Sequence, residues 1–194
     1  MPATPGQPVA TLTIVDRLNG PRHELALRTF MVIVLAHWAE HLLQVFQIYA
    51  LGWPVPESGG ALGLVFPWLV SSELLHYVYA LVMLAGLWLL RPGFTGVEDR
   101  RWWTIALGIQ FLHHIEHALL QLQAILGQNF FGAPVPTSIV QLWVPRVELH
   151  LFYNAVVFIP MVIAMYYHMF PPAPAAAGQH CTCAWHSRQS PAAV

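Results

Sequence analysis

The chain lacks lysine altogether, has few charged residues and has only two cysteines, and each shortage excludes a class of protein. Eight arginines are its only Lys or Arg residues and the net charge is -1, so we expect no nucleic-acid partner. Charged residues make up 9% of the chain, against roughly 25% in an average soluble domain. Both cysteines, Cys181 and Cys183, lie near the C-terminal end, so no disulfide framework can hold the body of the protein together. Packed secondary structure must supply the stability instead.

Hydrophobic residues make up most of the chain. The chain is 57% hydrophobic with a mean hydropathy of +0.55, and four segments reach the length of about 20 residues that a helix needs to cross a bilayer. They are residues 29–52, 62–90, 102–126 and 138–170. Stretches rich in glycine, proline and polar residues separate them and should end each helix. The sequence therefore predicts an all-α fold, an integral membrane four-helix bundle with up-down-up-down topology.

The arginines are distributed unevenly between the two sides of this predicted bundle. Apart from Arg146, which lies within the fourth span, they precede the first span, lie between the second and third, and follow the fourth, whereas the other two loops have none. Because positive residues favour the cytoplasmic side, we expect a multi-pass protein of the cell (inner or plasma) membrane with both termini cytoplasmic. Residues 1–28 would form a short cytoplasmic leader, 29–170 the bundle, and 171–194 a flexible cytoplasmic tail whose composition cannot bury a core.

An H-x-x-E-H motif occurs twice within the apolar spans. Positions i, i+3 and i+4 share one helix face, so each copy directs two imidazoles and one carboxylate the same way. A charged side chain near the bilayer centre costs roughly 2.5 to 3.5 kcal/mol, so a repeated ionisable motif should have a strong partner, and a metal ion is the strongest. The two copies are His37, Glu40 and His41, and His113, Glu116 and His117.

The other two spans carry a glutamate and a histidine each. With the predicted orientation, the ionisable groups of all four spans fall in one layer, about 15 Å from the external ends at 1.5 Å per residue. Convergence at one depth predicts a shared intramembrane site near the middle of the bilayer. The added candidate ligands are Glu73, His76, Glu148 and His150, which makes ten with the two motifs.

The chain also resembles a duplicated hairpin. HWAEHLLQ is followed by a Pro-Val-Pro loop and then ELLHYVYA, and HHIEHALLQ is followed by a second Pro-Val-Pro loop and then VELHLFYNA. Two helical hairpins of similar design predict a pseudo-twofold bundle with the site on its axis.

Four carboxylates would balance the charge of two divalent ions, and neutral imidazoles would complete their coordination. Soluble di-iron bundles use single glutamates from two helices and a Glu-x-x-His pair from each of the others, and Glu73 to His76 has that spacing. The histidine spacing resembles fragments of the histidine boxes of integral-membrane di-iron hydroxylases and desaturases. H-x-x-E-H is also the inverzincin metalloprotease signature, although its duplication in lipid argues against a protease. Iron is the first expectation for the two transition-metal ions, with zinc or copper as alternatives.

Three functions fit this pattern. The first is a di-metal oxidoreductase acting on an apolar or quinone-like substrate that enters from the lipid. The second is a transition-metal transporter or channel, and the third is a b-type haem electron-transfer subunit with histidine axial ligands. The protein could act as a homo-oligomer or as one subunit of a larger membrane complex. In the tail, the cluster His180, Cys181, Cys183 and His186 is either structureless or captures a soft metal ion.

Overall fold

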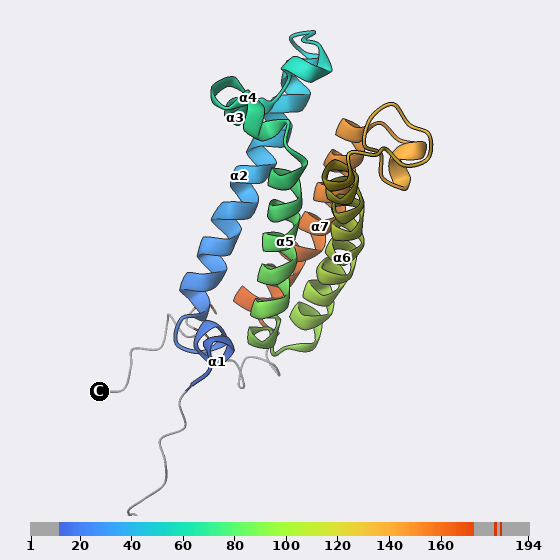
Figure 1. Cartoon of the computed structure of the whole chain (residues 1–194). Helices are drawn as coiled ribbons and strands as arrows, with labels where there is room; N and C mark the ends of the chain where they lie inside the picture. Colours follow the sequence, from blue (N-terminus) through green and yellow to red (C-terminus); the bar gives the residue numbers. More distant parts are fainter. Residues whose placement is uncertain (1–11, 173–180, 182, 184–194) are drawn as a thin grey trace, which may run out of the picture.

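The computed structural model describes residues 12–172, 181 and 183, and over these residues it contains helices and no strand. The predicted all-α class is confirmed. Four long helices lie side by side and alternate in direction, with their connections at opposite ends of the molecule (Figure 1). In chain order the elements are α1 (Ile14–Asn19), α2 (His23–Tyr49), η1 (Val55–Glu57), α3 (Gly60–Val65), α4 (Pro67–Val70), α5 (Glu73–Leu90), η2 (Arg91–Gly93), α6 (Val97–Leu126), η3 (Val140–Leu142) and α7 (Arg146–Met169).

Three of the long helices are apolar and long enough to cross a membrane. They are α2 (His23–Tyr49), the stretch Glu73–Gly93 that contains α5, and α7 (Arg146–Met169). The fourth, α6, is 30 residues long but has two acidic residues in its first turn and a row of polar residues further along. The predicted span 102–126 lies within α6.

The second predicted span is not one helix. Residues 62–90 are divided among α3, α4 and α5, and the main helix begins only at Glu73. Phe66 has φ -131 and ψ 65, outside the helical region, because the ring of Pro67 disfavours helical geometry in the residue before it. In the fourth predicted span, α7 begins at Arg146, directly after Pro145. The segments that precede α5 and α7, residues 50–72 and 127–145, are called the returning segments. Hydrogen bonds attach them to the ends of α2 and α6, respectively.

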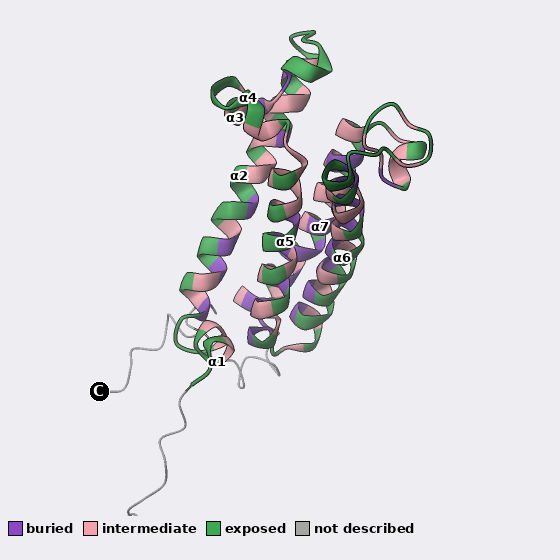
Figure 2. Ribbon diagram, in the orientation of Figure 1, coloured by how far each residue is buried: buried purple, intermediate pink, exposed green. Residues whose placement is uncertain are grey.

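An apolar core fills the middle of the bundle. Trp103 of α6 is fully buried, stacks on Phe94 with ring centroids 4.0 Å apart, and donates its indole N–H to the Leu87 carbonyl at 2.8 Å. Gly86 of α5 lies against the ring of Phe30 of α2, so these two helices approach closely at that level. Buried residues face inward, and the outer faces of the helices are exposed (Figure 2).

Helix α1 is fixed to the end of the bundle opposite the returning segments. Thr13 and Asp16 form a capping box that starts it, and Asn19 links it to the α5–α6 connection. The Asn19 amide donates to the Leu89 carbonyl at 2.7 Å, and its oxygen accepts the Gly93 N–H at 2.8 Å. These bonds place the start of α2 beside the end of α5.

Candidate metal centre

Six imidazoles from all four long helices meet near one end of the bundle. Within each H-x-x-E-H motif the two rings face each other, because residues four apart share a helix face. The Nε2 atoms of His37 and His41 are 3.0 Å apart, and those of His113 and His117 are 3.2 Å apart. The cluster, called the six-histidine cluster below, comprises His37, His41, His76, His113, His117 and His150.

These Nε2 separations match two ligands of one metal ion. An imidazole nitrogen binds a transition metal at about 2.0–2.1 Å, so two nitrogens at an angle of roughly 90 to 110 degrees lie roughly 2.9–3.4 Å apart. Both observed pairs fall in this interval. Each motif therefore holds its two Nε2 atoms at a separation that suits a shared ion and that one imidazole N–H can also bridge as a hydrogen bond.

His150 of α7 is the centre of the cluster. Its ring centroid lies 4.9 Å from that of His117, 5.6 Å from that of His113 and 5.7 Å from that of His41. His113, His117 and His150 are all buried, and one ligand atom from each lies within 4.8 Å of the others. Three imidazoles from two helices thus converge on a volume the size of one ion.

The hydrogen bonds of two histidines determine which nitrogen is available for a metal. The Nδ1 of His150 is 2.8 Å from the Arg146 carbonyl, and that of His76 is 2.9 Å from the Ser72 carbonyl. A carbonyl can only accept, so both rings carry their proton on Nδ1 and present a lone pair on Nε2. Among the described residues the buried His150 Nε2 has no hydrogen-bond partner. A buried lone pair aimed into a histidine cluster is what a metal ligand needs.

Two tyrosines hold the histidines in place by stacking. Tyr79 stacks on His37 with centroids 3.8 Å apart and an interplanar angle of 13°, and Tyr153 stacks on His113 at 4.4 Å and 27°. The Tyr79 hydroxyl donates to the Ile33 carbonyl at 2.6 Å, which fixes its ring. The tyrosines occupy matching positions, each three residues after the histidine of its helix.

The two motif glutamates bind backbone groups of the returning segments. Glu40 Oε2 accepts the Leu62 N–H at 3.0 Å, and Glu116 Oε2 accepts the Val140 N–H at 3.2 Å. Both carboxylates therefore attach a chain segment to the helix that carries the histidines. Such a bond gives one oxygen of each carboxylate a partner other than a metal ion.

The other two glutamates also have partners outside the cluster. Glu73 forms a bidentate pair with the Arg146 guanidinium, with both N–O distances at 2.6 Å, and so joins the first turns of α5 and α7. Glu148 accepts a short hydrogen bond from the Tyr49 hydroxyl. The structure brings the six predicted histidines together and directs the four predicted glutamates to other groups. That the glutamates ligate metal stays a prediction.

Two glutamines that the sequence reasoning did not single out hold the returning segments further along. Gln47 Oε1 accepts the Gly60 N–H at 2.9 Å, and Gln123 Oε1 accepts the Thr137 N–H at 3.1 Å. Each glutamine lies seven residues after the glutamate of its motif. This repeated spacing is the sequence signal that could have identified them.

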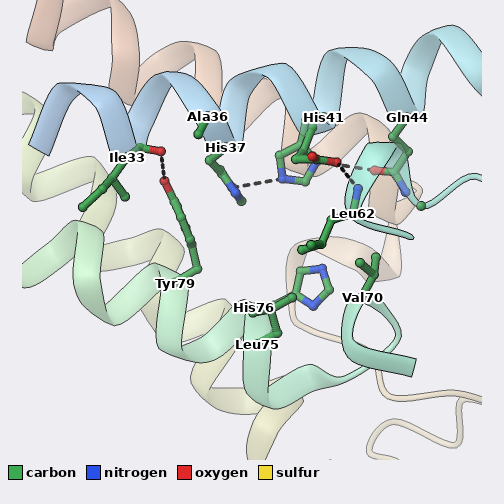
Figure 3. A pocket seen from close by; sticks show the side chains of 12 residues that line it. Ile33, Ala36, His37, His41, Gln44, Leu62, Val70, Leu75, His76 and Tyr79 are labelled. Atoms are coloured by element: carbon green, nitrogen blue, oxygen red, sulfur yellow. Dashed lines mark hydrogen bonds between the residues drawn. The ribbon is translucent and has the colours of Figure 1, made fainter. Parts of the chain in front are cut away.

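A cavity of about 390 Å³ opens beside the cluster, between α2, α5 and the α3–α4 segment (Figure 3). Its polar side is formed by three histidines together with a glutamate and a glutamine, namely His37, His41, His76, Glu40 and Gln44, and the rest of the lining is mainly apolar. The apolar lining includes Ile33, Ala36, Leu62, Val70 and Leu75. A second space of about 10 Å³ is enclosed by the histidines themselves, with Gln110 and Asn154. The first space has the size and character of a pocket for a small apolar molecule, and the second has room for an ion or a single water molecule.

A second group of potential ligands, which the sequence reasoning missed in part, lies at the other end of the bundle. It combines His23 and His168 with Cys181 and Cys183. His180 and His186, which the sequence assigns to the same tail cluster, lie outside the described residues.

The chain matches no family model, no curated protein and no solved structure. Its class follows from the fold and the site alone. It is an all-α protein with three helices that could cross a membrane and with buried histidine groups that could hold metal ions.

Proposed function

We propose that this protein is a membrane-embedded oxidoreductase in which the six-histidine cluster holds two transition-metal ions next to a pocket for an apolar or quinone-like substrate. The observation that carries the proposal is the convergence of six imidazoles from four helices, with paired Nε2 atoms at 3.0 and 3.2 Å. The proposal assigns the metal ligands to histidine and gives the glutamates an anchoring role.

All four long helices cross the membrane in this proposal, including α6. Its polar side chains Gln110, His113 and Glu116 are buried, so they lower the hydropathy of the helix without facing lipid. Its exposed side is apolar and suits a hydrocarbon environment. Large apolar side chains exposed on α6 are Ile105, Phe111, Leu112, Ile115, Leu122, Ile125 and Leu126.

The matching contacts of the two halves support duplication of a helical hairpin. Each half has a histidine pair 3.0–3.2 Å apart, a tyrosine stacked on its first histidine, and a glutamate that binds a returning segment. We assign one ion to each half. The second would be held by His113, His117 and His150, whose ligand atoms lie within 4.8 Å of one another. The first would be held by His37 and His41, whose Nε2 atoms are 3.0 Å apart. His76 would complete it by turning toward this pair, since its ring now lies nearer to those of His117 and His150.

The ligand atoms of the cluster limit which metals can bind. Imidazole ligands suit iron, copper, zinc and nickel, and no thiol belongs to the six-histidine cluster. We keep iron as the first choice, with copper as the redox-active alternative, because a redox-active pair of ions suits the adjoining apolar cavity. Zinc would fit the same ligands but has no redox chemistry, so zinc in the cluster would exclude the oxidoreductase activity. When bound, such ions supply electron transfer to or from the substrate. The protein residues bind the substrate, exclude water and hold the imidazoles in one protonation pattern.

The geometry favours bound metal ions over haem as the cofactor. It also favours a fixed metal site over a path along which a transporter or channel moves ions. The closed space among the histidines is about 10 Å³, far less than a haem needs. Between this cluster and the His/Cys group at the other end lies the apolar core around Phe30, Leu87 and Trp103. Its only metal-binding atoms among the core residues are methionine thioethers, such as those of Met83 and Met161, which suit soft ions such as Cu(I) better than divalent iron or zinc.

Elemental analysis of the purified full-length protein, combined with an optical spectrum, tests the proposal. We expect about two ions per chain in the unmodified protein. His113→Ala and His150→Ala should each lose metal, whereas His114→Ala should retain it, because His114 lies beside Tyr77 and outside the cluster. Full metal content in both cluster variants, or equal loss in all three, would contradict the assignment. A strong Soret band would replace the proposal by haem binding.

A further inference from the structure

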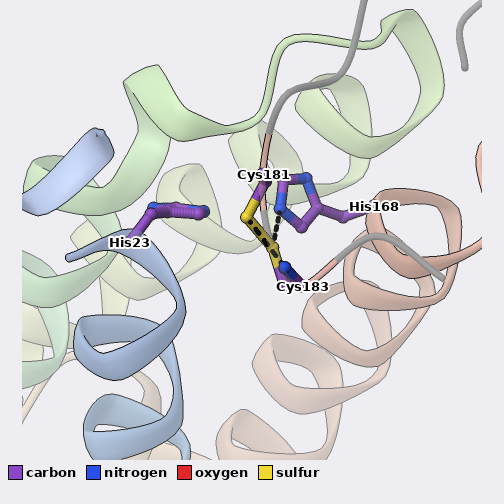
Figure 4. Close-up of side chains that lie close together, drawn as sticks. All are labelled: His23, His168, Cys181 and Cys183. Carbon is purple, nitrogen blue, oxygen red and sulfur yellow. Dashed lines mark hydrogen bonds between the residues drawn. A yellow bond between two sulfur atoms is a disulfide. The ribbon is translucent and has the colours of Figure 1, made fainter. Parts of the chain in front are cut away.

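A second set of ligands gathers at the end of the bundle where α1 lies, remote from the six-histidine cluster. One ligand atom from each of His23, His168, Cys181 and Cys183 lies within 4.8 Å of all the others. Cys181 and Cys183 form a disulfide, and the two histidines approach it from α2 and α7 (Figure 4). His23, His168 and Cys183 are buried, and Cys181 is partly buried.

His168 is oriented by a carboxylate. Its Nδ1 lies 3.2 Å from Asp99 Oδ2 on α6, and both side chains are about 1% exposed. The carboxylate accepts the Nδ1 proton, and Nε2 lies 2.9 Å from Cys183 Sγ. A disulfide sulfur can only accept a hydrogen bond, so Nε2 donates to it in the oxidised form and would have to release that proton to present a lone pair to a metal ion. A carboxylate behind a histidine whose other nitrogen faces a ligand set is the usual support of a metal-binding histidine.

His23 has the same arrangement with a backbone partner. Its Nδ1 is 3.2 Å from the Leu18 carbonyl, which leaves the lone pair on Nε2. Among the described residues that buried Nε2 has no hydrogen-bond partner. Gly93 makes the room for this ring, because a Cβ at that position would overlap the imidazole.

We propose that His23, His168, Cys181 and Cys183 form a redox-dependent zinc site. The site cannot bind zinc while the Cys181–Cys183 disulfide is present, and it can bind zinc after the disulfide is reduced. Two imidazoles and two thiolates are a common ligand set of structural zinc, and they neutralise a divalent ion. The site would join α2, α7 and the tail when zinc is bound.

A dithiol or two monothiols serve as the reductant of the Cys181–Cys183 disulfide. The Sγ–Sγ bond breaks, two electrons and two protons pass from the reductant thiols to Cys181 and Cys183, and the reductant becomes a disulfide. Zinc then displaces the two thiol protons, and both sulfurs bind as thiolates. Oxidation by a disulfide reverses both steps and releases the ion.

Cobalt titration of the full-length protein in detergent tests the proposal, with Co²⁺ as an optical probe for zinc. Thiolate bound to cobalt gives a charge-transfer band that histidine ligands do not, so the six-histidine cluster does not interfere. We expect this band in protein reduced with a phosphine and no such band in the oxidised protein. Added zinc should displace the cobalt and abolish the band.

Variants identify the histidine ligands. Cys181→Ser/Cys183→Ser should lose the band, and His23→Ala and His168→Ala should each weaken cobalt binding at least about tenfold. His23→Ala keeps the proposal testable if loss of the buried His168 prevents folding. His180→Ala/His186→Ala should retain the band, and His114→Ala should leave it unchanged. Absence of a thiolate band in the reduced protein, or a band that needs His180 and His186 but neither His23 nor His168, would overturn the proposal.

Discussion

At the residue scale, the position of one proton on each imidazole decides whether the cluster can bind metal. His76 and His150 each donate Nδ1–H to a carbonyl four residues earlier on the chain. These carbonyls lie at the N-terminal ends of α5 and α7, so each bond lies within one helix end. The orientation of the Nε2 lone pairs therefore depends on local structure and not on a contact between helices.

The role of the motif glutamates can be decided with isosteric variants. An amide oxygen can still accept the N–H of Val140 or Leu62, so Glu116→Gln and Glu40→Gln should keep the returning segments in place. If the carboxylates are anchors, both variants should retain the metal content of the unmodified protein in elemental analysis. Glu116→Ala, which removes the acceptor, should lower the free energy of unfolding by about 1–3 kcal/mol.

Loss of metal in the glutamine variants would show that the carboxylates are ligands, as the charge count of the sequence predicts. Composition and spacing alone could not separate these roles. The spacing places Glu40 and Glu116 on the same helix face as the histidines, but their partners come from loop segments more than twenty residues later in the chain.

At the scale of elements, the contact of α2 with α5 is set by one glycine. A Cβ at Gly86 would overlap the ring of Phe30, so Gly86→Ala must displace that buried ring or move the two helices apart. We expect a loss of about 1–3 kcal/mol in the free energy of unfolding, measured by denaturant or thermal titration in detergent.

Gly108 of α6 is the matched control for this experiment. A Cβ there meets nothing within 4 Å, so Gly108→Ala should stabilise the helix by about 0.5–1 kcal/mol. Equal effects of the two substitutions would contradict the close approach of α2 and α5.

The helices also show which features of the fold the sequence patterns predict and which they do not. Helical spacing predicts that His37 faces His41 and that His113 faces His117, and the structure brings each pair together. It does not predict that α5 begins at Glu73, because residues 62–72 are as apolar as the helix that follows. Pro67 and Pro145 were the available signals, since a proline marks a helix start or a break.

At the scale of the whole molecule, the bundle is built of three layers. The six-histidine cluster lies at the end of the returning segments, the apolar core fills the middle, and the His/Cys group lies beside α1. The sequence identifies a tail cluster of histidines and cysteines but not its helical partners, because His23, Asp99 and His168 are far apart in the chain and belong to no motif. Only the packing of α2, α6 and α7 brings them together.

The orientation of the whole bundle is testable by chemical labelling. In a background with both native cysteines replaced by serine, Glu57→Cys and Thr95→Cys place one thiol at each end of the bundle, and both positions are exposed. The arginine distribution predicts that an impermeant maleimide added to intact cells labels position 57, and labels position 95 only after the membrane is opened. The reverse pattern would invert the topology.

The most direct test of the central claim is an anomalous difference map from crystals of the metal-loaded protein, collected at the absorption edge of the metal that elemental analysis finds. The account predicts a peak about 2.0–2.2 Å from the Nε2 atoms of His113, His117 and His150, and a second peak among His37, His41 and His76. A map with no peak among these six histidines, or with peaks only at carboxylates on the surface, would contradict it.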